Sequence, residues 1–295
     1  MRQINFENQR LHVSSSVTYT ATLEIKRETV EYLSVLLAAR RTQRGTRAGT
    51  RALGPFKQAV LVLRWFCDGT RVRQLATDNA ISRSTAYDYL HEGIDALAAD
   101  APDLATALAE AKAWGAGHLN LDGTVIRTDR ISTPGPNRAD LWWSGKHKHH
   151  GGNVQVLSDP DGFPLWTSGV RPGREHDTTC AKAAEGLVEA LEQAATETGL
   201  LTLTDLGYEN LSPAIRTPVK KPKNAELTEE QKAYNQVIRG VHAVAERANS
   251  LLKTTFKALR RVSLDPWRIG AIVAAAFVIL RLEHGRYLTG DHNPS

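Results

Sequence analysis

The spacing of apolar residues changes near residue 117, and this change limits the folds that the chain can adopt. From Phe56 to Phe66 the apolar residues recur at helical spacing, whereas residues 118–126, with the sequence HLNLDGTVI, alternate as a strand does. A chain of 295 residues, 41% of them hydrophobic, has room for one large domain or two modest ones. We therefore expect a helical front region followed by a region that mixes strands and helices.

The front region is predicted to contain a helix-turn-helix motif. Helices are expected at residues 24–40 and 56–66, and then at 72–79 and 83–98, where Ser82 is the expected N-cap of the last helix. A short helix, a tight turn and a longer helix that begins Ser-Arg-Ser-Thr form this pattern, in which the first turn of the second helix enters the major groove. The side chains expected to face DNA are Arg83, Ser84, Thr85 and Tyr87. An ordinary three-helix bundle that does not bind DNA stays open as the alternative.

The charge distribution favours a polyanionic partner. The formal net charge is +5, but residues 40–83 alone contain ten Lys and Arg against two Asp. Residues 41–54, rich in Arg, Gly and Thr without an apolar period, are predicted to be a linker or a basic arm along phosphates. A solvated basic surface is the alternative, and the concentration of charge favours nucleic acid over it.

The second region is predicted to be an α/β domain with a ribonuclease-H-like mixed sheet flanked by helices. Its expected strands form a meander, then continue after a helix at 178–198 with a short strand that ends at Asp205 and one at 215–219. A long helix is expected at 228–262, and the apolar run 269–280, too short to span a bilayer, is expected to be a buried helix. This order places antiparallel strands first and parallel strands later.

Two acidic residues of this sheet are candidates for catalysis. Asp122 lies among Leu119, Leu121, Val125 and Ile126, where an acid costs several kcal/mol to bury unless it is paired, hydrogen-bonded or bound to a metal. Asp205 ends an apolar strand, and ligands collect at strand ends in such sheets. A simple turn-forming role is an equally weighted alternative for Asp205.

Glu246 is the third candidate, and its sequence context is weaker. On a helix it shares one face with His242, Asn249, Lys253 and Lys257. Taken alone, a Glu followed by Lys residues is typical of a solvated helix face. With two strand carboxylates, however, it would complete a set able to hold two divalent cations about 3.5–4 Å apart for phosphoryl transfer.

Other chemistries fit the sequence less well. The two cysteines, Cys67 and Cys180, are far apart, which favours a reducing cytosol over a disulfide scaffold. His147, His149 and His150 lack a second ligand pair at zinc spacing. The chain contains no phosphate-binding glycine loop of the GxxxxGK[ST] type and no GxSxG nucleophile elbow.

An ordered series of segments resembles one protein family. LDGTVI, WWSGKHKHHGGNVQVLSDPDGFPLW, SGVRPGREHD, LTDLGYEN and VAERANSLLKTTFKALRRV are similar to the insertion-sequence transposases of the DDE superfamily, in the branch close to Harbinger-like elements. The resemblance covers roughly residues 54–264. It departs from the family pattern at Leu206 and Ala245, neither of which is one of the three acids.

The resemblance implies a DNA transposase that cuts and rejoins DNA at inverted repeats. Carried over to this chain, it makes Asp122, Asp205 and Glu246 the catalytic and metal-binding residues, with two Mg²⁺ or Mn²⁺ ions expected. His176 and Asp177 match a recurrent pair with a supporting role, and a structural turn is the alternative for them. The residues expected to contact DNA are Arg83, Ser84, Thr85, Tyr87, Arg71, Arg73, Lys146, Lys148, Lys253 and Lys257. It also implies double-stranded DNA as partner, a homodimer or larger assembly on DNA, and no membrane.

The expected organisation follows from these patterns. Residues 1–53 form an N-terminal arm and helix, 54–114 a helix-turn-helix domain with a connector, 115–288 the nuclease domain and 289–295 a tail. The N-terminus carries no signal-peptide pattern, so a cytoplasmic, nucleoid-associated protein is expected. The alternative is a domesticated or inactive transposase that acts as a sequence-specific DNA-binding protein.

Overall fold

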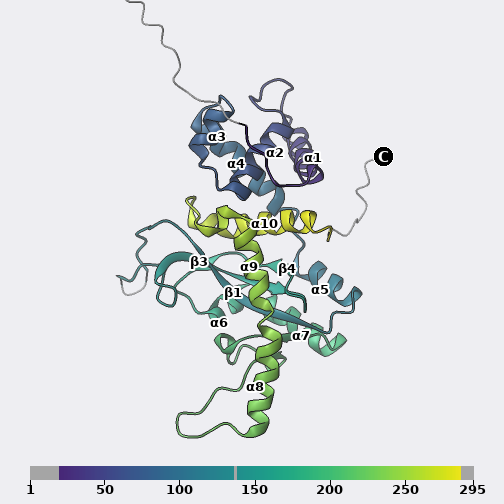
Figure 1. The fold of residues 1–295 in the computed structure, drawn as a ribbon, viewed down its shortest axis with the longest axis vertical. Coiled ribbons are helices and arrows are strands. Elements are labelled where there is room, and N and C mark those ends of the chain that lie inside the picture. Colours follow the sequence, from purple (N-terminus) through teal and green to yellow (C-terminus); the bar gives the residue numbers. More distant parts are fainter. Residues whose placement is uncertain (1–19, 136–137, 287–295) are drawn as a thin grey trace, which may run out of the picture.

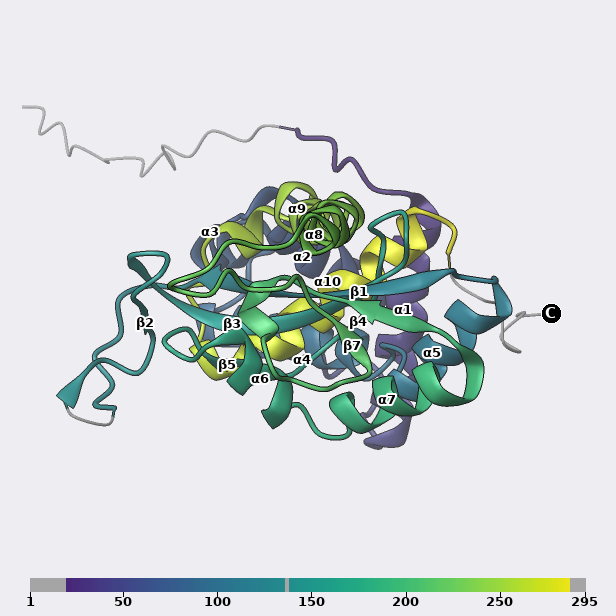
Figure 2. The ribbon, with the colours of Figure 1, turned by 90° about the horizontal axis from the view of Figure 1, so that it is seen from below.

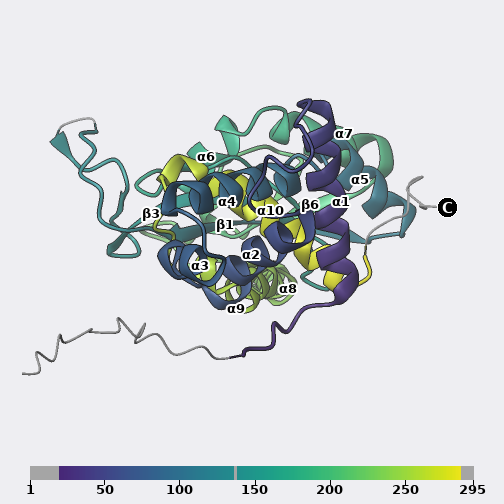
Figure 3. The same cartoon turned by 90° about the horizontal axis from the view of Figure 1, so that it is seen from above.

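The computed structural model describes residues 20–135 and 138–286. Figure 1 shows helices α1–α4 above a mixed β-sheet, with helix α10 running between these two layers. Seen from above, in Figure 3, the four helices lie over α10 and the sheet. Most of the predicted N-terminal arm and the predicted tail at 289–295 lie outside the described residues.

The upper layer consists of helices that begin and end close to their predicted bounds. They are α1 (Arg27–Gln43), α2 (Pro55–Asp68), α3 (Val72–Asp78) and α4 (Arg83–Ala98). Pro55 begins α2, where a missing N–H costs little, and Gly69 ends it with a left-handed φ of 65°. The backbone N–H of Thr85 donates to Ser82 Oγ at 3.1 Å, which caps α4. Helices α3 and α4, with the turn between them, therefore have the order of a helix-turn-helix.

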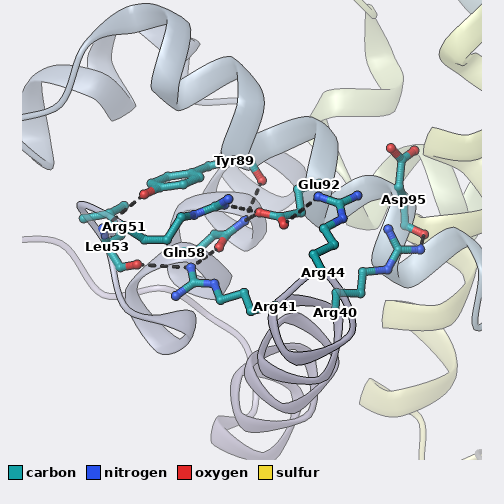
Figure 4. A network of polar contacts seen from close by, with 9 residues as sticks. All are labelled: Arg40, Arg41, Arg44, Arg51, Leu53, Gln58, Tyr89, Glu92 and Asp95. Atoms are coloured by element: carbon teal, nitrogen blue, oxygen red, sulfur yellow. Dashed lines mark hydrogen bonds and ion pairs between the residues drawn. The ribbon is translucent and has the colours of Figure 1, made fainter. Parts of the chain in front are cut away.

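The arginine-rich segment between α1 and α2 folds back onto α4 (Figure 4). Arg44 and Arg51 both pair with the buried carboxylate of Glu92, Arg44 at 3.1 Å. Gln58 Nε2 donates to the same carboxylate at 2.8 Å, and Arg41 donates to the Gln58 side-chain oxygen at 2.5 Å. Arg44 and Arg51 are thus held against the helical layer by an internal acid. Residues 44–54 form no helix or strand and link α1 to α2, as one of the two predicted roles requires.

The sheet is built around β1 (His118–Arg127). It pairs antiparallel with β3 (His149–Ser158) and parallel with β6 (Leu201–Leu203), which in turn pairs parallel with β7 (Ile215–Arg216). Three short strands pair antiparallel with β3: β2 (Trp143–Ser144), β4 (Pro164–Thr167) and β5 (Arg171–Pro172). An antiparallel meander extended by parallel strands is the ribonuclease-H-like arrangement that the sequence predicts.

The two faces of the sheet pack against different helices (Figure 2). Leu119 and Leu121 of β1 belong to a core shared with α5 (Leu104–Ala113) and α7 (Leu187–Thr198). Ile126 belongs to a second core, shared with α9 (Ala245–Thr255) and α10 (Ile269–Glu283). Side chains alternate between the faces of a strand, so Asp122 is expected on the same face as Ile126, toward α9.

Two helices that the sequence predicts as continuous are interrupted. The helix expected at 178–198 divides into α6 (Asp177–Ala183) and α7, because Ala184 is extended and Gly186 adopts a left-handed φ of 67°. The helix expected at 228–262 divides into α8 (Glu229–His242), α9 and the 3₁₀ helix η3 (Lys257–Arg260). At the break between α8 and α9, Gly162 packs so closely on the Val244 carbonyl that a side chain at position 162 would not fit.

Helix α10 holds the two layers together. Its residues are almost wholly buried, as expected for the apolar run 269–280, and they join one core with α1, α2 and α4 above and with β3 below. Arg281 makes a bidentate, buried pair with Glu110 of α5 at 2.9 and 3.0 Å. Within the described ranges, no helix is both long and apolar enough to cross a membrane.

Candidate functional site

Asp122 lies in the middle of the central strand, half-buried. It stands opposite Val156 of β3, and Asn249 Nδ2 of α9 donates to its Oδ2 at 2.8 Å. Burial raises the pKa of Asp122 to about 6, the charge on His242 opposes the rise, and Asp205 and Asp177 add to it. The carboxylate is thus held on the α9 face of the sheet, with two other acids near enough to repel its charge.

The face of α8 and α9 that covers Asp122 is polar. Nε2 of His242 lies 3.2 Å from the carbonyl oxygen of Leu121, one residue before Asp122. One turn beyond Asn249, Lys253 is half-buried: burial lowers its pKa, whereas the Asp122 carboxylate raises it. The structure therefore brings His242, Asn249 and Lys253 of the predicted helical stripe to Asp122.

Asp205 follows β6 and fills the turn-forming role that its sequence context allows. Its Oδ1 accepts the backbone N–H of Gly207 at 2.8 Å and so caps the 3₁₀ helix η2 (Leu206–Tyr208). Its charge also acts on Asp122, so the carboxylate faces the same region. The turn role and a place beside Asp122 are compatible, because one carboxylate oxygen is enough to cap the turn.

Asp177, at the first position of α6, lies closer to the centre of the site than the sequence suggests. Its Oδ1 accepts Asn153 Nδ2 at 2.7 Å, and its Oδ2 lies 3.6 Å from Lys146 Nζ. A methyl group on Gly123, the residue after Asp122, would collide with Asp177 Oδ1. The bare backbone at Gly123 is therefore what lets the carboxylate of Asp177 approach the strand that carries Asp122.

A buried polar chain supports Asp177. Tyr208 donates from its hydroxyl to Gln155 Oε1 at 2.6 Å, and Gln155 Nε2 donates to Asn153 Oδ1 at 3.0 Å. All three side chains are buried, and burial together with the nearby acids raises the pKa of Tyr208 well above its usual value. Tyr208 therefore stays a hydroxyl donor. Sequence reasoning missed this chain, although polar residues alternating with Val154 and Val156 in β3 are a signal that could have revealed it.

Glu246 is more exposed than Asp122, Asp177 and Asp205. It lies in the first turn of α9, is exposed, and precedes Asn249 by one helical turn. Of the three acids predicted to bind metal, Asp122 and Asp205 lie near enough for their charges to interact, and Glu246 is exposed on the helix that covers Asp122.

The donor atoms at this site suit a hard divalent cation. Carboxylates and amide oxygens are the ligands that Mg²⁺ and Ca²⁺ prefer, and Asn249 Oδ1 is buried beside Asp122 without a hydrogen-bond partner. Among the residues that the structure describes, no three His, Cys, Asp or Glu side chains are grouped closely enough to hold a metal ion. Charge repulsion acts over longer distances than ligation does, so the acids influence one another without having converged.

A cavity of about 320 Å³ lies beside Asp177. Its lining includes Lys146, His147, His176 and Asp177. Burial lowers the pKa of His147, and the charges of Lys146 and His149 lower it further. His176 is exposed and precedes α6 without capping it through its side chain. Lys148, also exposed, lies in the turn before β3 with a φ of 56°. Lys146, His176 and Asp177 are thus together at one opening, and Lys148 is beyond it.

The histidines of the KHKHH segment have other partners. Nε2 of His150 lies 3.1 Å from Asp140 Oδ2, and Nδ1 of His149 lies 3.0 Å from the carbonyl oxygen of His150. Burial raises the pKa of the Cys180 thiol to about 12, which keeps it protonated. These contacts give no support to a zinc site.

The residues predicted to contact DNA from the helix-turn-helix divide into two groups. The hydroxyls of Ser84 and Thr85 each lie 2.8 Å from Ser82 Oγ, so they belong to the cap of α4. Arg83 and Tyr87 are exposed, and they line one cavity with Arg71, Arg73 and Lys257. Lys257 belongs here rather than with Lys253, because α9 ends at Thr255 and Phe256 is extended.

The part of the chain that contains the candidate acids is similar to known proteins. A family model described as DDE superfamily endonuclease matches residues 121–281, which include Asp122, Asp177, Asp205 and Glu246. A probable transposase for insertion sequence element IS702 of Microchaete diplosiphon is 29% identical over 115 residues. That match spans 38% of this chain and 39% of the relative.

A solved structure, the Mos1 transposase paired-end complex with left transposon end, is 13% identical and aligns over 83% of both chains. The TM-score of this alignment is 0.21, too low for any argument about a shared fold.

Proposed function

The chain belongs to the family of DDE superfamily endonucleases, and from this premise we propose that it is a metal-dependent DNA transposase. The observation that carries the proposal is the half-buried Asp122 at the centre of the sheet. Its pKa is raised to about 6 by burial and by two neighbouring acids, as expected of a carboxylate built to face a cation. Transposition, its inverted-repeat substrate and pairing of two element ends by a dimer are parts of this proposal.

The proposed metal ligands are Asp122, Asp205 and Glu246. Two Mg²⁺ or Mn²⁺ ions would supply positive charge that activates a hydroxyl nucleophile and stabilises the leaving oxygen of a phosphodiester. Asn249 positions the Asp122 carboxylate through its 2.8 Å hydrogen bond, and the capped turn positions Asp205. Half-buried Lys253 contributes a positive charge next to Asp122 where the scissile phosphate would lie.

The other parts of the chain have proposed roles in holding DNA. Residues 54–114 act as the helix-turn-helix unit, with Arg83 at the start of the recognition helix, and residues 115–288 act as the nuclease unit. Exposed Lys146 and His176 line the opening beside Asp177, exposed Lys148 lies beyond it, and all three face the DNA backbone in this proposal. Such a protein acts on chromosomal DNA, in the nucleoid.

Cleavage assays on DNA that carries the element ends test the three acids. Asp122→Asn, Asp205→Asn and Glu246→Gln are each expected to abolish strand nicking in Mg²⁺ or Mn²⁺ while the affinity for DNA is retained. Glu230→Gln, an exposed acid in the first turn of α8, is the matched control and keeps full activity. A variant that nicks at the wild-type rate removes its residue from the site.

Exposed Glu246 is the observation that favours a second function, that of an inactive transposase that binds specific DNA. Nicking by Asp177→Asn, compared with nicking by Glu246→Gln and by the wild-type protein, separates an active enzyme with a different third ligand from an inactive DNA-binding protein. If Asp177→Asn abolishes nicking and Glu246→Gln does not, Asp177 is the third ligand of an active enzyme. If the wild-type protein binds end DNA and never nicks it with either metal, the binding function replaces the enzyme.

A further inference from the structure

A basic cavity lies where the helix-turn-helix meets the end of the nuclease region. It has a volume of about 420 Å³, and we call it the junction pocket. One wall comes from the end of α2 and the beginnings of α3 and α4, and the other from η3 and the chain after it. The lining residues are Trp65, Gly69, Thr70, Arg71, Val72, Arg73, Arg83, Tyr87, Lys257, Ala258, Arg261 and Ser263.

The junction pocket concentrates positive charge. Five of its lining residues are Lys or Arg and none is acidic. Arg261 pairs with Asp129 at 2.5 Å, whereas Arg71, Arg73, Arg83 and Lys257 make no ion pair within residues 20–135 and 138–286. Like charges gathered around one cavity repel one another, and an anion that enters the cavity relieves this repulsion.

The two walls of the junction pocket are fixed to each other. Beneath it, the rings of Phe66 in α2 and Phe256 before η3 meet edge to face, 6.0 Å apart, and both are buried. A Cβ atom on Gly69 would lie 3.2 Å from Cβ of Lys257, so the end of α2 already touches η3. Lys257 is therefore held facing the helix-turn-helix.

We propose that the junction pocket binds the phosphate backbone of DNA and contacts one stretch of backbone from both walls. This inference rests on the proposed DNA-binding function and adds a site that the recognition helix alone does not provide. Arg83 and Tyr87 belong both to the pocket and to the first two turns of α4, so a backbone in the pocket runs directly past the recognition helix. Because the two walls are already fixed to each other, a backbone held in the pocket sets the register of the duplex on the helix-turn-helix and on the nuclease region at once.

DNA affinity measured against salt tests this site. Arg71→Gln and Lys257→Gln remove one charge from each wall, and both residues are exposed, so both variants should fold. Fluorescence anisotropy with a labelled duplex of mixed sequence, from about 50 to 200 mM salt, gives the slope of log K against log salt. Each variant should bind several-fold more weakly and reduce the slope by about 1. The double variant should be non-additive, because both cations act on the same stretch of backbone.

Lys112→Gln is the matched control, an exposed cation on α5, away from the junction pocket. If the wild-type protein binds DNA and both pocket variants match this control, the junction pocket is overturned while the proposed function stands. If the wild-type protein binds no DNA, the proposed function itself fails. Inorganic phosphate could instead raise the melting temperature of the wild-type protein but not that of Lys257→Gln, while both pocket variants bind DNA as tightly as the wild-type protein. In that case the pocket is a free-anion site and the DNA assignment is overturned.

Discussion

At the scale of single residues, the surroundings of Asp122 decide its behaviour. Its usual pKa of 3.8 rises to about 6 because burial penalises the charged form and Asp205 and Asp177 repel it. His242 opposes the rise. An acid whose pKa is raised by folding makes the folded state less stable wherever the acid is ionised. The site thus stores repulsion that a divalent cation would relieve.

Asp122→Asn should therefore stabilise the metal-free protein at neutral pH. The contribution of Asp122 to stability is fully present below its unfolded pKa of 3.8 and is lost as the pH rises through about 6. The gain from the substitution should approach zero well below pH 3.8 and reach up to about 3 kcal/mol at pH 7.5, since each pKa unit corresponds to about 1.4 kcal/mol. Urea unfolding at a series of pH values, in a chelator, measures it.

Asp103→Asn is a control of opposite sign. Asp103 caps α5, and the backbone N–H of Thr106 holds the pKa of its carboxyl below the usual value. Its contribution is present above pH 3.8 and is lost as the pH falls through the lowered pKa, so this variant should be less stable at neutral pH. If Asp122→Asn proves equally destabilising at pH 7.5, repulsion within the site is not the dominant effect.

The candidate site could be predicted from the sequence only in part, for a reason visible in single residues. Asp122 was predictable because an acid within an apolar strand demands a partner, whatever the tertiary structure. Asp177 was not given a central place, because its approach depends on bare Gly123 of a different element. The sequence pattern continues the helix through Phe256 and so predicts Lys257 on the same face as Lys253. In the structure α9 ends at Thr255 and Phe256 has a β-type backbone, so Lys257 lies on another surface.

At the scale of elements, the carboxylate of Glu92 organises the helical layer. Arg44 and Arg51 reach it from the segment before α2, and Gln58 reaches it from α2 itself (Figure 4). The helices themselves were predictable from their apolar spacing and caps. The fold of the arginine-rich segment was not, because it is determined by an acid about 40 residues away in sequence, and sequence periodicity carries no information on such a contact.

Glu92→Ala should destabilise the protein by about 3 kcal/mol, the low end of the range for breaking a buried pair, because exposed Arg44 can return to solvent. The segment between α1 and α2 should also become more sensitive to trypsin, since its arginines lose their partner. Glu31→Ala is the matched control: its exposed pair with Arg27 is worth less than 1 kcal/mol. Equal loss of stability in both variants, measured by urea unfolding, would contradict a structural role for Glu92.

At the scale of the whole molecule, the helical layer and the sheet share one interior. Helix α10 packs on α4 above and on the sheet below, and the same core includes Phe66 and Phe256. The change in apolar spacing near residue 117 correctly predicts where helices give way to strands. It does not reveal that a helix from the end of the chain returns to lie between the two regions, because that placement depends on which faces remain uncovered after each region forms.

A shared core implies that the two layers unfold together. Glu110→Ala should lower the stability of the whole protein by about 3–5 kcal/mol, because it leaves the guanidinium of Arg281 buried in α10 without its bidentate partner. Since α10 belongs to both layers, hydrogen exchange should accelerate by the same factor in α2 and α4 as in β1 and β3.

Calorimetry of the same variant provides the second measurement. The wild-type protein and Glu110→Ala should each show a single transition whose calorimetric and van't Hoff enthalpies agree, with the transition of the variant shifted to lower temperature. Two resolved transitions, or exchange that accelerates in the strands while α2 and α4 keep their protection, would mean that the helical layer is stable without α10. In that case the junction pocket would join two separately folding units, and its phosphate contacts would have to hold them in register.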